Sequence, residues 1–161
     1  MSSSDDTLLL CYDGSEDAAH AIESAGRLFA TRHAIVLSVW QPIADAGVIP
    51  SYGEIASMLD FVELDRAAAD AGARVAADGV RIAKTAGIEA EPLAVKATGP
   101  IWKTILDVAG SHDAAVIVMG SRGLSGVRSL LPGSVSNAVV HHADRPTLVV
   151  RPSHAEEATE S

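Results

Sequence analysis

The chain has 161 residues, 48% of them apolar, which is enough for one domain with a single buried core but too little for two. Its formal net charge of −9 repels nucleic acid and anionic membrane surfaces, so we expect it to bind neither. The single cysteine, Cys11, excludes an intrachain disulfide. The N-terminal residues lack the features of a signal peptide, and no apolar run approaches the roughly 20 residues of a membrane span, so we expect a cytoplasmic location.

The first third of the chain predicts two strands around one helix. Residues 8–12 form an apolar run that stops at Asp13-Gly14-Ser15, a pattern typical of a buried strand entering a turn and a helix cap. Apolar residues then recur every three or four positions from 18 to 29, which predicts an amphipathic helix. A second strand is expected over 34–40. The stretch 41–57 contains prolines and glycines without a period, so we expect a long loop that is either a lid over a site or partly disordered.

The same alternation continues to the C-terminus. The expected elements are a long helix over 60–86, a weaker strand over 90–95, a helix opened by Gly99-Pro100, an apolar strand over 114–119, a helix over 134–142 and a strand over 147–150. Five strands that alternate with four helices predict an α/β fold, a doubly wound parallel sheet with helices on both faces. Ligands in such sheets bind at the carboxyl ends of the strands. We expect one domain over 7–152 between disordered ends at 1–6 and 153–161.

A glycine-rich segment follows the strand over 114–119. Gly120 and Gly123 come directly after the strand, and Gly133-Ser134 opens the next helix, which gives the pattern G-x2-G-x9-G-S. Glycines let a backbone approach a ligand closely, and a helix N-terminus offers unpaired N–H groups, a combination that suits phosphate. No acidic residue occurs between 114 and 143, whereas the segment contains two arginines. The alternative interpretation is that these are turn glycines and that Ser134 only caps a helix.

Other nucleotide motifs and a catalytic set are missing from the sequence. It contains neither a P-loop, G-x-x-x-x-G-K-[ST], nor the dinucleotide fingerprint G-x-G-x-x-G. The hydroxyls of Ser134 and Ser136 can each donate to a phosphate oxygen, but neither serine has a catalytic base beside it in sequence. His141 and His142 have no third ligand at metal-binding spacing, so we assign no catalytic residue and no protein metal site. Trp40 and Tyr52 could stack on a base, although an aromatic residue at a strand end more often packs in the core.

The glycine-serine pattern belongs to a wider resemblance. The matching segments are Tyr12–Ser15, Leu37–Val39, Gly99-Pro100, Asp113–Met119, Val135-Ser136 and Arg145–Val150. Together they resemble the ATP-binding branch of the universal stress protein family over nearly the whole chain, except the two polar ends and the stretch 41–57. The resemblance implies the strand order 3-2-1-4-5 of adenine nucleotide alpha hydrolase-like folds, with the ligand crevice between the first and fourth strands.

The resemblance also implies which residues bind the nucleotide. Backbone near Cys11 and at Val39 would meet adenine, Asp13 and the Gly120 region would hold the ribose, and 133–136 would bind the phosphates. The full implied set is Cys11, Asp13, Val39, Met119, Gly120, Arg122, Gly123, Gly133, Ser134, Val135 and Ser136. By the same resemblance, Arg122 would add a further phosphate contact. One departure from the family pattern is Pro132, which could rigidify or tilt the phosphate loop.

The leading functional hypothesis is an ATP-binding stress or regulatory protein with slow or no hydrolysis. Efficient turnover has little support, because phosphoryl transfer needs a held metal and a positioned base or water, and the phosphate segment contains no carboxylate. Mg²⁺ would be carried by the nucleotide. The resemblance also favours a homodimer formed through the strand Thr147–Val150, an apolar edge that invites pairing. Two alternatives stay open: a weak ATPase or adenylating enzyme of the same fold, and a dimeric interaction module with an empty site.

Overall fold

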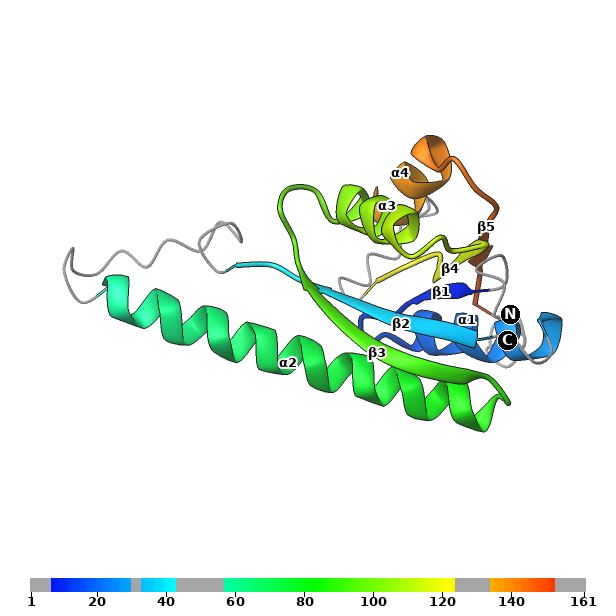
Figure 1. Cartoon of the computed structure of the whole chain (residues 1–161), viewed down its shortest axis with the longest axis horizontal. Coiled ribbons are helices and arrows are strands. Elements are labelled where there is room, and N and C mark those ends of the chain that lie inside the picture. Colours follow the sequence, from blue (N-terminus) through cyan, green and yellow to red (C-terminus); the bar gives the residue numbers. More distant parts are fainter. Residues whose placement is uncertain (1–6, 30–32, 43–56, 124–133, 153–161) are drawn as a thin grey trace, which may run out of the picture.

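The computed structural model describes residues 7–29, 33–42, 57–123 and 134–152, with side chains from residue 61 onward in the third of these segments (Figure 1). The ends expected to be disordered, most of the expected loop, Tyr52 and Gly133 lie outside these residues. The elements in chain order are β1 (Leu8–Cys11), α1 (Glu16–Leu28), β2 (His33–Trp40), α2 (Ser57–Thr85), β3 (Glu89–Lys96), α3 (Ile101–Ser111), β4 (Val116–Gly120), α4 (Ser134–His142) and β5 (Thr147–Val150).

All five strands form one parallel sheet in the order β3-β2-β1-β4-β5, which confirms the predicted fold class. β1 is central, so Leu9 is paired with Ile35 of β2 on one side and with Ile117 of β4 on the other. The chain therefore builds the sheet outward from β1 in two directions. This reversal creates the topological switch point at the carboxyl ends of β1 and β4.

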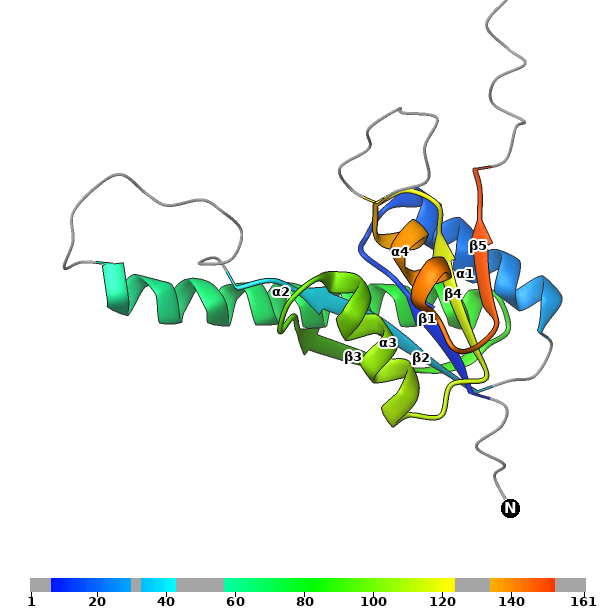
Figure 2. The same cartoon turned by 90° about the horizontal axis from the view of Figure 1, so that it is seen from above.

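Two helices cover each face of the sheet, as Figures 1 and 2 show. The alternation of side chains along β1 separates two cores, because successive residues of a strand point to opposite faces. Leu8 and Leu10 pack with residues of α1 and α2, whereas Leu9 packs with residues of α3 and α4. All three leucines are fully buried, which accounts for a first strand that is apolar without interruption.

Small residues let the long helix α2 lie close to the sheet. A methyl group on Gly79 would stand 2.6 Å from Val36 Cγ1 and 2.8 Å from Tyr12 Cδ1, and one on Gly72 would stand 3.1 Å from Trp40 Cδ1. Trp40 thus packs against α2, with Lys96 Nζ 5.6 Å from its ring centroid, so the core interpretation of this tryptophan is the one the structure supports. The N-terminal part of α2 extends beyond the sheet (Figures 1 and 2).

Two predicted boundaries were wrong by a few residues. The long helix begins at Ser57, three residues before the expected start, because helical periodicity alone does not mark an N-terminus without a capping residue. β4 begins at Val116 and not at 114, because the Ala114 N–H donates to Ala109 O at 3.0 Å and closes the turn after α3. Among the described residues, no helix is both long and apolar enough to cross a membrane.

Candidate functional site

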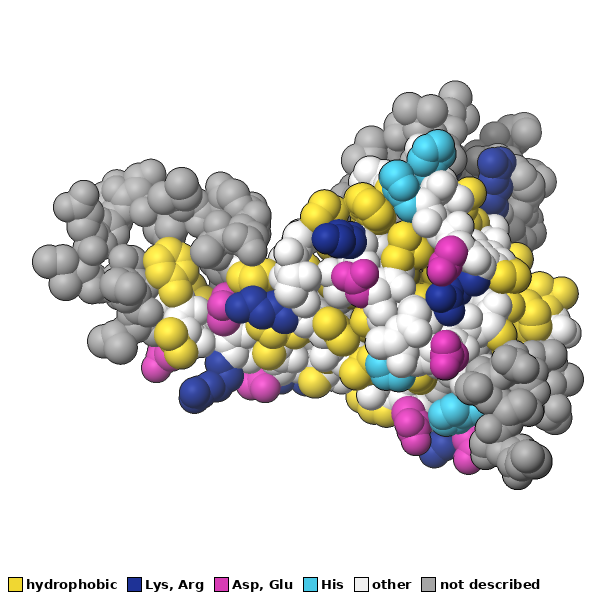
Figure 3. All heavy atoms as spheres, turned by 45° about the horizontal axis from the view of Figure 1, so that its top comes forward, with side chains coloured by type: hydrophobic (Ala, Val, Ile, Leu, Met, Phe, Trp, Pro, Cys, Tyr) yellow, Lys and Arg dark blue, Asp and Glu magenta, His cyan; other side chains and the backbone are white. Residues whose placement is uncertain are grey.

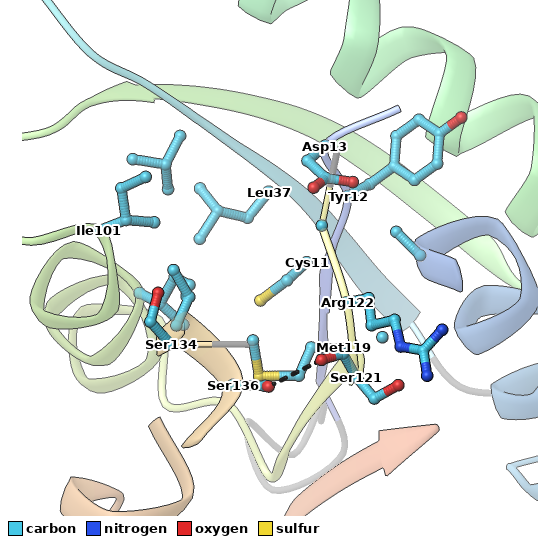
Figure 4. A pocket seen from close by; sticks show the side chains of 16 residues that line it. Cys11, Tyr12, Asp13, Leu37, Ile101, Met119, Ser121, Arg122, Ser134 and Ser136 are labelled. Atoms are coloured by element: carbon cyan, nitrogen blue, oxygen red, sulfur yellow. Dashed lines mark hydrogen bonds between the residues drawn. The ribbon is translucent and has the colours of Figure 1, made fainter. Parts of the chain in front are cut away.

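A cavity opens at the switch point, between the carboxyl ends of β1, β2 and β4 and the N-terminal ends of α3 and α4 (Figure 4). It holds about 750 Å³ of empty space, with the open solvent at its mouth included.

All of the site residues implied by the resemblance that the structure describes line this cavity. They are Cys11, Asp13, Val39, Met119, Gly120, Arg122, Gly123, Ser134, Val135 and Ser136. The remaining one, Gly133, lies outside the described residues. Sequence reasoning missed the lining residues Tyr12, Ala18, Leu37, Ile101, Ile105 and Ser121. One spacing could have found Leu37, because it shares a strand face with Val39. Ile101 and Ile105 lie one helical turn apart, which puts them on one face of α3 but does not say what that face contacts.

Asp13 is held in a fixed position by the turn between β1 and α1. The Ser15 N–H donates to Asp13 Oδ1 at 2.9 Å, and the Ser15 hydroxyl accepts from the Ala18 N–H at 3.2 Å, which caps α1. Gly14 has φ +89°, a left-handed conformation that favours glycine. Asp13 is therefore both the turn-forming carboxylate and a lining residue of the cavity. A methyl group on Gly123 would stand 2.8 Å from Asp13 Oδ2, so the segments after β1 and β4 meet here.

Gly120 lies at a close approach of two backbones. A methyl group at this position would stand 2.8 Å from Asp17 C and 2.9 Å from both Asp17 O and Ala18 N, in the first turn of α1. Any side chain larger than hydrogen would push α1 away from β4. The first glycine of the motif is thus required for packing, independently of any ligand.

The start of α4 is joined to the end of β4. The Ser136 hydroxyl donates to Ser121 O at 3.2 Å, and both serines are buried (Figure 4). The Ser121 N–H in turn donates to Val150 O at 2.9 Å, which continues the ladder between β4 and β5. Ser134, at the first position of α4, is exposed. The expected donation from Ser136 to a phosphate therefore competes with an existing hydrogen bond, whereas Ser134 has no such bond within the described residues.

Cys11 lies on the floor of the cavity, and its sulfur points into it (Figure 4). Burial, reinforced by the negative charge of Asp13, raises the pKa of the Cys11 thiol to about 12. The same two causes raise the pKa of Tyr12, whose ring points away from the cavity centre toward α2. At neutral pH the cysteine is a protonated thiol, which is a poor nucleophile, so it serves the site as an apolar surface.

The elements around the cavity contribute side chains of different character. β2 and α3 supply only apolar ones, Leu37, Val39, Ile101 and Ile105, whereas the polar ones come from the ends of β1 and β4 and the start of α4. Figure 4 shows Leu37 and Ile101 on one side and Ser121 and Arg122 on the other. Asp13 is the only carboxylate among the described lining residues. Such a cavity suits a ligand with an apolar end and a polar end.

The chain matches the model of the "Universal stress protein family" over residues 6–151. It is 33% identical over 148 residues to the "Universal stress protein in QAH/OAS sulfhydrylase 3'region" of Thermus aquaticus, covering 90% of this chain and 98% of that protein. It is also 30% identical over 147 residues to "Universal stress protein YxiE" of Bacillus subtilis, covering 89% of this chain and 97% of that protein.

Solved structures of similar proteins share the fold at lower identity. Universal stress protein UspA from Lactobacillus plantarum has a TM-score of 0.68 and 22% identity, covering 91% of this chain and 97% of its own. A universal stress protein in complex with cAMP has a TM-score of 0.61 and 23% identity, covering 92% and 98%. The universal stress protein from Archaeoglobus fulgidus in complex with dAMP has a TM-score of 0.55 and 20% identity, covering 90% and 96%. From its sequence and its fold, the chain belongs to the universal stress protein family.

Proposed function

We propose that this protein binds ATP in the cavity between β1 and β4 and that nucleotide occupancy regulates its interactions during stress. Mg²⁺ enters with the nucleotide, and hydrolysis is slow or absent. The observation that carries the proposal is the division of the cavity into an apolar side, built by β2 and α3, and a polar side that ends at the N-terminus of α4. The two neighbours bound to cAMP and dAMP support an adenine nucleotide as the ligand class.

The chemistry of the lining residues fits the parts of an adenine nucleotide. Adenine would lie against Val39, Ile101 and Cys11, whose side chains are uncharged. The Asp13 carboxylate can accept a hydrogen bond from a ribose hydroxyl while its Oδ1 holds the turn. The N–H groups and dipole at the start of α4, with the Ser134 hydroxyl and the Arg122 guanidinium, would meet the phosphates.

Efficient hydrolysis has little support from these residues. Phosphoryl transfer requires a positioned base or water and a held metal ion. Asp13 is the only carboxylate among the described lining residues, and the described part of the chain has no cluster of three or more His, Cys, Asp or Glu side chains able to hold a metal. The Cys11 thiol is protonated at neutral pH. We therefore favour a sensor over a weak ATPase or an adenylating enzyme.

We further propose a homodimer that pairs β5 with its copy. The two edges of the sheet differ in kind: β3 carries Glu89, Glu91, Pro92 and Lys96, all exposed, whereas β5 (Thr147–Val150) has no charge and no proline. Charges and proline on an edge strand oppose pairing with another chain. The β5 edge is thus the one suited to a partner strand.

Neither nucleic acid nor a membrane is proposed as a partner, and we place the protein in the cytoplasm. On the face shown in Figure 3, acidic and basic side chains are interspersed and form no continuous basic patch. The net charge of −9 adds a general repulsion toward polyanions.

Calorimetric titration of nucleotide-free protein with Mg-ATP tests the proposal. Two variants, Gly123→Ala and Ser134→Ala, should bind more weakly, because the first displaces the Asp13 carboxylate and the second removes a phosphate donor. A phosphate-release assay on the same samples separates the alternatives. Rapid release would favour the enzyme, and no binding at millimolar ATP would leave the dimeric module with an empty site.

A further inference from the structure

The hydrogen bond between Ser136 and Ser121 replaces one that the sheet cannot make. In β5, Pro146 O accepts from the Ile117 N–H at 3.0 Å and Val150 O accepts from the Ser121 N–H at 2.9 Å. The backbone N–H and C=O groups of the even-numbered residues of β5 therefore point toward β4. In a parallel ladder, the carbonyl of Ser121 would next accept from the amide of residue 152. Residue 152 is a proline and has no N–H, so the ladder ends at this carbonyl.

The Ser136 hydroxyl supplies the missing donor from another element. Its oxygen lies 3.2 Å from Ser121 O, and the two serines are only 4% and 6% exposed, so water does not easily take over this role. A hydroxyl has a single proton, so while it donates to this carbonyl it does not donate to a second acceptor. The bond spans 15 positions in sequence and joins the first turn of α4 to the end of β4, the two elements that flank the glycine-serine motif.

We propose that Ser136 is a positioning residue that fixes the N-terminus of α4 relative to Gly120 and Gly123, and that it does not donate to the nucleotide. This inference rests on the proposed nucleotide function and assigns Ser136 a role different from that of Ser134. Because the α4 N-terminus is the proposed phosphate end of the site, a loss of the bond weakens phosphate binding and leaves adenosine binding intact. Pre-organised donors bind more tightly because less order must be gained on binding.

Ser136→Ala is the first variant of the test, and Ser111→Ala is its matched control. Ser111 is also a helical serine whose hydroxyl donates to a backbone carbonyl, Val108 O at 3.2 Å, but it does not line the cavity. Losing one buried hydrogen bond predicts roughly a 3- to 10-fold weaker affinity of Ser136→Ala for Mg-ATP, with the affinity for adenosine changed less than about twofold. Ser136→Thr keeps the hydroxyl, so its ATP affinity should be close to that of wild type and higher than that of Ser136→Ala.

A second variant separates positioning from stability. In Ser136→Ala/Pro152→Ala, the new amide at position 152 can complete the ladder to Ser121 O, so the thermal midpoint should recover toward wild type. The bond to α4 stays broken, so the ATP affinity should stay low. Amide hydrogen exchange of the nucleotide-free Ser136→Ala protein should be faster at 121–123 and 134–136 and unchanged in β1.

Three results would overturn the inference. Ser136→Ala could bind ATP as tightly as wild type, it could lose ATP and adenosine affinity equally, or the double variant could regain ATP affinity along with stability. Failure of the proposed function would show in a different measurement, the titration of wild-type protein, which would then bind no Mg-ATP.

Discussion

Replacing Gly120 by alanine tests the close approach of β4 and α1. The added methyl group would stand 2.8–2.9 Å from backbone atoms of Asp17 and Ala18. Backbone in a capped helical turn cannot rotate away as a side chain can, so the cost lies toward the upper end of the ~1–3 kcal/mol typical of overpacking. The lower entropy of the unfolded alanine chain offsets ~0.4–1 kcal/mol of it. We expect a net loss of about 2 kcal/mol.

Urea denaturation measures this loss. With an m-value of roughly 1–3 kcal/mol/M, the unfolding midpoint of Gly120→Ala should fall by about 1 M. The matched control is Gly99→Ala, because a methyl group on Gly99 meets no atom within 4 Å and its φ is not in the left-handed region. Its stability should change by less than about 0.5 kcal/mol. If the two variants were equally stable, the packing argument for Gly120 would be refuted.

Three further predictions follow from the described contacts. Arg145→Met should lower the free energy of unfolding, measured by urea denaturation, by about 2 kcal/mol, because Arg145 Nη1 donates to Ala109 O at 2.8 Å and to Ala114 O at 2.9 Å. A loss under about 0.5 kcal/mol would contradict this. The Cys11 thiol loses its proton above its ordinary pKa of 9.0 in the unfolded state, and only near a pKa of 12 in the folded state. The free energy of unfolding should therefore fall as pH rises between these values, and it should fall more in wild type than in Cys11→Ala. Parallel pH curves for the two proteins would refute this. The backbone N–H of Val149 is directed to the open edge of β5, while its side chain packs on the core, so Val149→Pro should convert a dimer to a monomer in light scattering at micromolar concentration. A wild-type monomer would remove the dimer proposal.

Sequence reasoning located the helices and strands best where a glycine or a proline stands at their ends. The helix over 134–142 and the strand over 147–150 have their predicted bounds, because a glycine at position 133 precedes the helix in sequence and Arg145-Pro146 precedes the strand. The long helix lacks such a start signal, and its first residue was misplaced. Periodicity and composition indicated a doubly wound sheet but could not order its strands. That order came from the resemblance, and the structure confirms it.

The candidate site likewise contains residues that the sequence could assign and residues that it could not. Residues next to a motif glycine, such as Arg122 and Ser134, could be assigned to the cavity because they follow a strand end or open a helix. Ile101 and Ile105 could not, because their position depends on which face of α3 packs on the sheet. The Ser136–Ser121 bond was also beyond reach, because it depends on the register between β4 and β5 and on a proline 16 residues after Ser136.

The most direct test of the central claim locates the nucleotide. Backbone amide signals of ¹⁵N-labelled protein would be followed by NMR during titration with Mg-ATP. A second hollow of the surface, the groove between α1 and α2, is lined by Glu23 and Arg27 of α1 and by Asp78 and Arg81 of α2. The account predicts saturable shifts at Gly120, Gly123, Ser134 and Val135, with smaller shifts along that groove. Shifts confined to that groove, or none at millimolar ATP, would contradict a nucleotide site between β1 and β4.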